Sequence, residues 1–104
     1  RLAEEARAAL QAAGLANVSL LLGDGTLGWR DCAPFDAIVV AAASPDVPQP
    51  LWDQLSAGGR MLLPLGEQSA QVLTLVTCRD GRAVRTPLAG ARFVPLLGTF
   101  GFDA

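Results

Sequence analysis

The chain has 104 residues, a formal net charge of −2 and 51% apolar residues, which fits one compact domain or a piece of a larger one and excludes a disordered segment. All eight basic residues are arginines scattered along the chain, so no cluster follows a phosphate backbone and nucleic acid is not an expected partner. The absence of histidine excludes a histidine base, a Ser-His-Asp or Cys-His nucleophile and most zinc sites, and no metal site is expected.

The apolar runs and the start of the chain bear on its location. The longest apolar runs, such as residues 37–43, are far shorter than the roughly 20 residues of a membrane helix. No basic-then-apolar signal opens the chain, so a cytoplasmic protein without a membrane partner is expected. The chain begins at Arg1, without an initiator methionine and already inside a helical pattern, and we expect a missing front part.

The first half of the chain predicts one helix and two strands. Residues 1–13 have an apolar stripe at helical spacing and predict a helix that ends at Gly14. Residues 17–22 predict a short strand that runs into the Gly-Asp-Gly turn at 23–25. Residues 35–42 are nearly continuous in apolar side chains, which is typical of a strand in the middle of a parallel sheet covered by helices on both faces.

The second half predicts a helix followed by strands, of which the last ones are antiparallel. The helix is expected over 50–55, and the strands over 60–65, 71–77, 83–88 and 92–97. Asp80-Gly81 is the two-residue signal of a tight hairpin. The order indicates an α/β fold, the second part of a doubly wound sheet with an antiparallel edge.

Ligands of such sheets bind beyond the C-terminal ends of the parallel strands. Asp24 lies between two glycines at one strand end, where its carboxylate could accept a hydrogen bond from an adenine amino group and Gly25 could bring its N–H to the ring edge. An ordinary tight turn with a solvated aspartate is the alternative. Ala41 and Ala42 end the next strand and leave room for a substrate, or they allow close packing of helix on sheet.

Two tryptophans add little to the prediction of a site. Trp29 and Trp52 are interpreted as packing residues of the core or its border rather than as platforms for stacking a ligand.

Three motifs occur together and in order. They are GDGTLGW at 23–29, APFDAIVVAAASPDVPQPLWDQLSAGGRMLLPLG at 33–66 and RFVPLLG at 92–98. Each is weak alone, but as a set, with this spacing, the chain resembles the protein-L-isoaspartate O-methyltransferase family over essentially its full length.

The resemblance implies a Rossmann-like enzyme that transfers a methyl group from S-adenosyl-L-methionine to the free carboxyl of L-isoaspartyl residues in damaged proteins, its expected partners. A carboxylate is ionised at pH 7 and can attack a sulfonium methyl without a general base, which suits a chain without histidine. Residues 1–104 would form the C-terminal portion of one catalytic domain. The glycine-rich loop and the active-site serine would lie upstream, so no catalytic residue is assigned here.

The family's binding residues carry over to six positions. By the resemblance, Asp24 would hold the adenine amino group and Gly25 would offer its N–H to the ring. Around the isoaspartyl group, the pocket floor and border would be formed by Ala41, Ala42, Val94 and Pro95. Leu97 departs from the threonine often found there, which puts a hydroxyl contact on the cofactor side in doubt.

Two alternatives stay open. One is another Rossmann-like methyltransferase that acts on a small molecule. The other is an inactive truncated fragment, and residues 1–104 alone are expected to be neither active nor well folded. The full-length form is expected to be a monomer.

Overall fold

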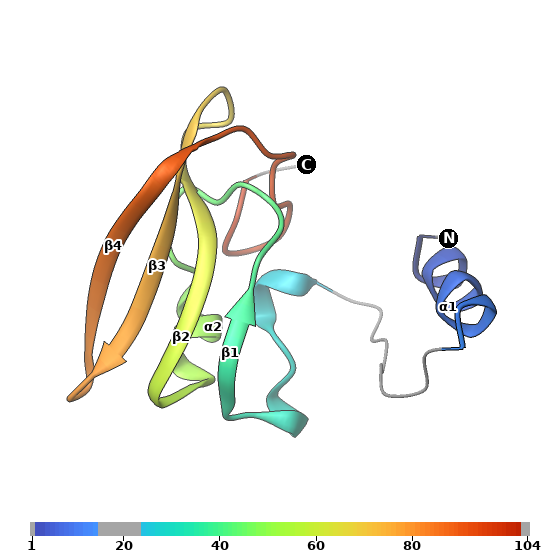
Figure 1. The fold of residues 1–104 in the computed structure, drawn as a ribbon, viewed down its shortest axis with the longest axis horizontal. Coiled ribbons are helices and arrows are strands. Elements are labelled where there is room, and N and C mark those ends of the chain that lie inside the picture. Colours follow the sequence, from blue (N-terminus) through green and yellow to red (C-terminus); the bar gives the residue numbers. More distant parts are fainter. Residues whose placement is uncertain (1, 15–23, 103–104) are drawn as a thin grey trace.

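The computed structural model describes residues 2–14 and 24–102. Helix α1 spans Leu2–Ala12 and stands apart from the sheet (Figure 1). Gly14 follows it with a φ of +75°, the left-handed conformation that glycine adopts after a helix end, so the predicted helix and its end are confirmed. The strand predicted over 17–22 lies outside the described residues.

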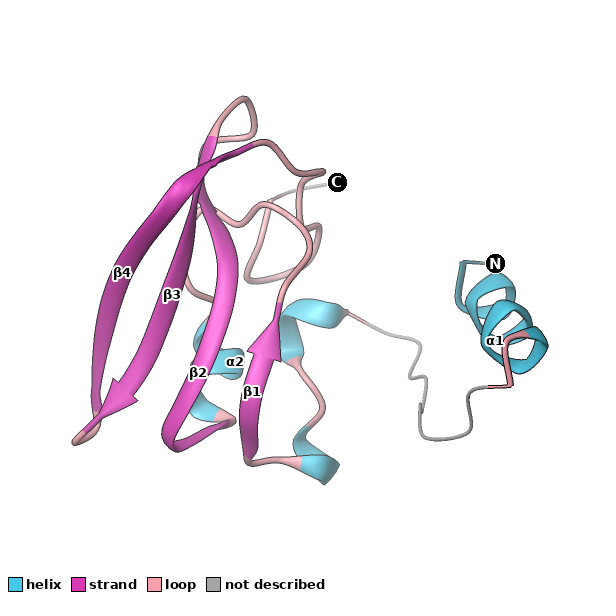
Figure 2. Ribbon diagram, viewed as in Figure 1, coloured by secondary structure: helices cyan, strands magenta, loops and turns pink. Residues whose placement is uncertain are grey.

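Four strands form one sheet in the order β1-β2-β3-β4. Strand β1 (Phe35–Val39) pairs in parallel with β2 (Leu55–Gly66), and helix α2 (Gln49–Asp53) lies between them in the sequence. Strands β3 (Gln71–Arg79) and β4 (Arg82–Ala91) follow, each antiparallel to the strand before it (Figures 1 and 2). The mixed α/β sheet with an antiparallel ending matches the prediction. Among the described residues, no helix is long and apolar enough to cross a bilayer.

The parallel pair differs from the prediction in its bounds. Strand β1 ends at Val39, three residues early, and β2 begins at Leu55, five residues before the predicted start. Backbone hydrogen bonds nevertheless continue beyond β1, from Val40 N–H to Leu62 O (2.9 Å) and from Ser44 N–H to Pro64 O (3.0 Å). The segment after β1 therefore keeps following β2 in an irregular form.

The hairpin between β3 and β4 is confirmed. Asp80 and Gly81 both have positive φ angles, 52° and 75°, as a two-residue turn matching the twist of its strands requires. Arg79 pairs with Arg82 across this turn.

The strand predicted over 92–97 is wrong. The segment makes two isolated parallel bridges, Pro95 with Ala43 and Leu97 with Phe102. Around the first, Ala43 N–H donates to Val94 O (2.6 Å) and Leu96 N–H donates to Ala43 O (2.7 Å). The segment therefore pairs at single points and forms no continuous ladder.

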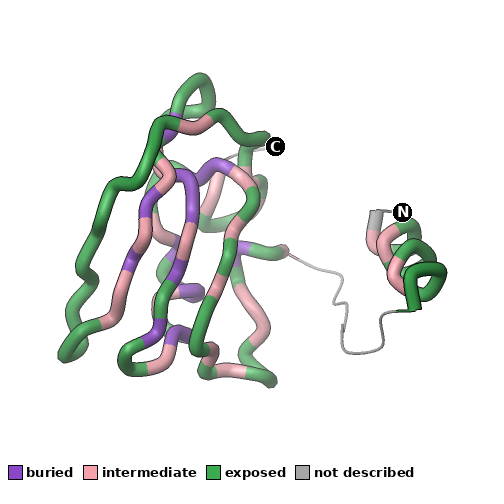
Figure 3. Tube along the Cα trace, in the orientation of Figure 1, coloured by how far each residue is buried: buried purple, intermediate pink, exposed green. Residues whose placement is uncertain are grey.

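The buried residues of the core come from α2, β2 and β3 (Figure 3). They are Leu51, Leu55, Met61, Leu63 and Val76. Residues alternate along β2, so Met61 and Leu63 both face inward and are fully buried. This alternation buries one face of the sheet, and the burial stabilises the fold by about 25 cal/mol for each Å² of apolar surface removed from water.

Within the described residues, β1 is covered on one face. Ile38 and Val40 pack against the core, but the Val39 side chain between them is 72% exposed. Within residues 24–102 the strand pairs with β2 alone and forms an edge of the sheet. Strand β1 therefore exposes an apolar side chain, that of Val39, which the described residues do not cover.

Candidate functional site

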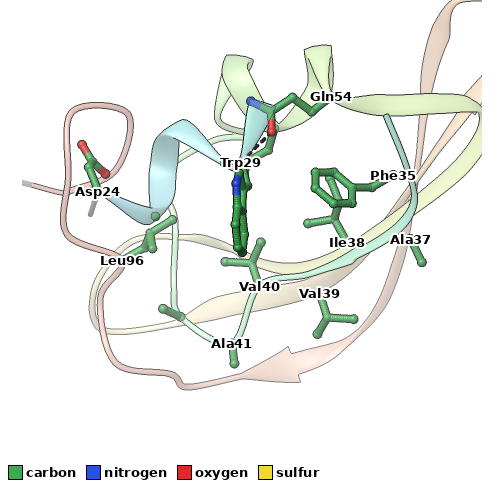
Figure 4. A pocket seen from close by; sticks show the side chains of 14 residues that line it. Asp24, Trp29, Phe35, Ala37, Ile38, Val39, Val40, Ala41, Gln54 and Leu96 are labelled. Carbon is green, nitrogen blue, oxygen red and sulfur yellow. Dashed lines mark hydrogen bonds between the residues drawn. The ribbon is translucent and has the colours of Figure 1, made fainter. Parts of the chain in front are cut away.

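A cleft of about 630 Å³ lies along β1 (Figure 4). The cleft is lined by the turn after residue 23 and by strand β1 with the residues that follow it. Single residues of α2, of the C-terminal end of α2 and of the C-terminal segment complete the lining. The lining residues are Asp24, Gly25, Gly28, Trp29, Phe35, residues 37–42, Leu51, Gln54 and Leu96. This volume falls within the range of about 300–1,000 Å³ that small-molecule sites occupy.

The Asp24 carboxylate receives three hydrogen bonds. One oxygen accepts from the Thr26 N–H (2.9 Å) and the Thr26 hydroxyl (2.6 Å), and the other accepts from the Thr99 N–H (2.9 Å). These bonds, the Thr26 hydroxyl foremost and the Thr99 N–H next, lower the pKa of Asp24 from 3.8 to about 2. The group is therefore an anion at neutral pH, at one end of the cleft.

Thr26 joins this turn to the C-terminal segment. It is fully buried, and its hydroxyl accepts a hydrogen bond from the Phe100 N–H (3.2 Å) while donating to Asp24. Gly98 passes so close that a Cβ on it would overlap the Asp24 carboxylate. Asp24 thus ties residues 98–100 to the turn, and an acceptor position remains on it because a carboxylate can accept about four hydrogen bonds.

Gly25 begins the short 3-10 helix η1 (Gly25–Leu27). A Cβ at this position would meet nothing within 4 Å, so the glycine faces open space. Within residues 24–102, the Gly25 N–H has no hydrogen-bond acceptor. The group can therefore approach a ligand in the cleft.

Gln54, at the end of α2, fixes the Trp29 side of the cleft. Its amide oxygen accepts from the Trp29 N–H (2.8 Å; Figure 4), and its amide nitrogen donates to Leu27 O (2.8 Å). Gly28 lies between these two partners with a φ of +68°, and a Cβ on it would overlap the Gln54 amide. The turn therefore rests directly on a buried glutamine.

The predicted site residues divide into two groups. Asp24, Gly25, Ala41 and Ala42 line the one cleft. Val94 and Pro95 do not line it but lie beside Ala43, the next residue after the alanine pair. The structure thus brings the six positions to one end of the parallel strands, with Val94 70% exposed outside the cleft.

Three contributors were missed or misread from the sequence. Trp29 lines the cleft instead of the core, whereas Trp52 packs against the core as expected. An aspartate two residues before a threonine signals a local turn, and this could have indicated Thr26. Gln54 gives no sequence signal, since its partners lie 25 and 27 residues away.

Comparison with known families and proteins gives a consistent result. The family model described as protein-L-isoaspartate(D-aspartate) O-methyltransferase matches residues 1–100. A protein-L-isoaspartate O-methyltransferase of Methanoculleus marisnigri is 48% identical over 102 residues, 98% of this chain and 46% of that protein. One of Geobacter metallireducens is 49% identical, over 97% of this chain and 47% of that protein. The chain spans about half the length of the curated relatives that it matches.

Solved structures show the same likeness. A protein-L-isoaspartate O-methyltransferase superposes with a TM-score of 0.87 at 29% identity, over 95% of this chain and 32% of that one. A putative protein-L-isoaspartate O-methyltransferase from Plasmodium falciparum, in complex with S-adenosyl-L-homocysteine, superposes with a TM-score of 0.59 at 28% identity, over 80% and 36%. The described fold is thus that of part of a Rossmann-like methyltransferase, and the chain belongs to the protein-L-isoaspartate(D-aspartate) O-methyltransferase family.

Proposed function

We propose that the complete protein containing residues 1–104 transfers a methyl group from S-adenosyl-L-methionine to the free carboxyl of L-isoaspartyl residues in damaged proteins. The observation that carries the proposal is the meeting of Asp24, Gly25 and the Ala41-Ala42 pair in one cleft, in a chain of this family. The Plasmodium falciparum structure supports the choice of cofactor, since its ligand is what remains of S-adenosyl-L-methionine after methyl transfer.

The cleft residues fit such a cofactor. Asp24 has an acceptor position left for an amino group, and the Gly25 N–H faces open space. Trp29, Phe35 and Ile38 give the cleft apolar walls against which a planar base can pack. When bound, the cofactor would supply an electrophilic methyl group on a sulfonium.

The residues of this chain would bind and orient, with no proton transfer assigned to them. We assign Asp24 to the amino group of the adenine and Gly25 to the ring edge. Ala41, Ala42, Val94 and Pro95 would border the isoaspartyl residue, because the alanines present little bulk and Ala43 joins them to the Val94 segment. Positioning two reactants in this way can contribute up to about 7–11 kcal/mol to catalysis.

We refer to residues 24–29 as the cofactor side, and to residues 41–43 with 93–95 as the acceptor side.

The assignment of residues 1–104 to the C-terminal portion of one catalytic domain stays a prediction. So do the cytoplasmic location and the monomeric state.

The substrate class is tested with two matched peptides and a radiolabelled methyl donor. The complete protein should label a peptide with one L-isoaspartyl residue and leave its L-aspartyl counterpart unlabelled. Equal labelling of both would contradict the acceptor assignment. Labelling of neither, with S-adenosyl-L-homocysteine still bound, would favour the small-molecule methyltransferase.

A further inference from the structure

Two glutamines are buried, Gln54 at the end of α2 and Gln71 at the start of β3, and each uses both the oxygen and the nitrogen of its side-chain amide in hydrogen bonds. Gln54 and Gln71 are each 4% exposed. Burying an amide is unfavourable unless its donor and acceptor find partners, so these positions need glutamine for a reason other than packing.

Gln54 supports the cofactor side. Its amide accepts from the Trp29 N–H and donates to Leu27 O, both at 2.8 Å. Within residues 24–102, these two bonds are the long-range hydrogen bonds of residues 27–29, whose other hydrogen bonds are local. The position of Trp29 in the cleft wall therefore depends on this one side chain.

Gln71 supports the acceptor side in the same manner. Its amide nitrogen donates to Glu67 O (2.6 Å) and Gln68 O (3.1 Å), and its oxygen accepts from the Phe93 N–H (2.8 Å). Phe93 is the residue before Val94, whose carbonyl then accepts from Ala43. Gln71 thus sets where the chain leaves β4 and enters the acceptor side.

We propose that Gln54 and Gln71 are positioning residues that act separately, Gln54 on cofactor binding and Gln71 on acceptor binding. The Gln71 half rests on the proposed function, whereas the Gln54 half requires only that the cleft binds the cofactor. Each acts through a backbone segment and touches neither reactant. Methionine is close in size but offers no N–H donor and only a weak acceptor, so it would remove the side-chain partner of the Trp29 N–H and Leu27 O on one side, and of the Phe93 N–H and the two carbonyls on the other.

The test compares Gln54→Met, Gln71→Met and Gln49→Met in the complete protein. Gln49 lies on α2 as well, but it is exposed and bonds only to Asp53 one turn away, which makes it the matched control. The readouts are the Kd of S-adenosyl-L-homocysteine by calorimetry, the KM of the isoaspartyl peptide at saturating cofactor, kcat and the melting temperature.

We expect Gln54→Met to raise the cofactor Kd about tenfold and leave the peptide KM unchanged. Gln71→Met should raise the peptide KM about tenfold and leave the cofactor Kd unchanged. Gln49→Met should change neither. Equal effects of both variants on both constants, or no effect from either, would overturn the proposal.

Gln54→Glu tests the role of Gln54 in cofactor binding even if Gln54→Met fails to fold. A glutamate keeps the acceptor for the Trp29 N–H but sets a second oxygen against Leu27 O, and only its protonated form can donate there. The loss of cofactor affinity should therefore shrink as the pH falls from 8 to 5, while the wild type stays level. A loss independent of pH would overturn the Gln54 half. If the wild type labels no isoaspartyl peptide, the proposed function fails, and the cofactor Kd still tests Gln54.

Discussion

The cofactor side and the acceptor side differ in how far side-chain hydrogen bonds hold them together. The cofactor side is held by the side chains of Asp24, Thr26 and Gln54, each of which bonds to backbone groups of another segment. On the acceptor side, Ala43 joins the Val94 segment through backbone groups, Gln71 adds a side-chain bond to the Phe93 N–H, and the alanines contribute their small size. Substitutions of the polar side chains, Gln71 included, should therefore act by lost hydrogen bonds, and substitutions of the alanines by added bulk.

The largest effect should come from Gly28→Ala. The new methyl group would displace the Gln54 amide, and the alanine backbone would have to keep an unfavourable positive φ. The free energy of unfolding should therefore fall by about 2–4 kcal/mol. Gly25→Ala is the control within the same turn, because its Cβ would meet nothing, and it should cost less than about 0.5 kcal/mol. Chemical denaturation measures both, and equal losses would show that Gln54 does not support this turn.

A smaller effect is expected from Ala42→Val on the acceptor side. Two added methyl groups would narrow the half-buried end of the cleft, and the KM of an isoaspartyl peptide should rise about tenfold or more. The Kd of S-adenosyl-L-homocysteine should change less than twofold. A larger change in the cofactor Kd than in the peptide KM would remove the distinction between the two sides.

The smallest effect concerns pH. The pKa of Asp24 is lowered to about 2 in the folded state, whereas an aspartate of the unfolded chain titrates at about pH 4. The hydrogen bonds of Asp24 therefore stabilise the folded state fully above about pH 4. This stabilisation is lost as the pH falls through about 2. Asp24→Asn should reduce the dependence of unfolding on pH in this window. Asp46→Asn is the comparison, because the Val47 N–H and Arg85 also lower the pKa of Asp46, on a loop outside the cleft lining. An unchanged pH dependence in Asp24→Asn would show that its bonds do not persist in solution.

Local signals in the sequence predicted much of the fold. Asp80-Gly81 indicated the hairpin, whose two turn residues have positive φ, and the mostly apolar run over 60–65 indicated β2. The strand over 92–97 was wrong because β-forming residues were counted, whereas the segment pairs only at single points, with Ala43 and with Phe102. The coverage of β1 on both faces stays a prediction, because it depends on partners that a single strand's composition does not reveal.

The site was predictable where one residue type carries the chemistry by itself. Asp24 between two glycines stood out, and four of the six predicted positions share the cleft. Gln54 and Gln71 did not stand out, because the partners that give them their roles lie more than 20 residues away in the chain. These partners are Leu27 and Trp29 for Gln54, and Phe93, just after the end of β4, for Gln71. Such tertiary hydrogen bonds leave no periodic trace in a sequence.

The central claim, that the cleft at Asp24 binds the cofactor, is tested most directly by calorimetry of S-adenosyl-L-homocysteine with Asp24→Ala in the complete protein. The Kd should rise about ten- to hundredfold, because a donor of the ligand loses its partner. Asp46→Ala removes a comparable hydrogen-bonded carboxylate, 2.7 Å from Arg85, and should leave the Kd unchanged. An unaltered Kd in Asp24→Ala, or equal losses in both variants, would contradict the assignment.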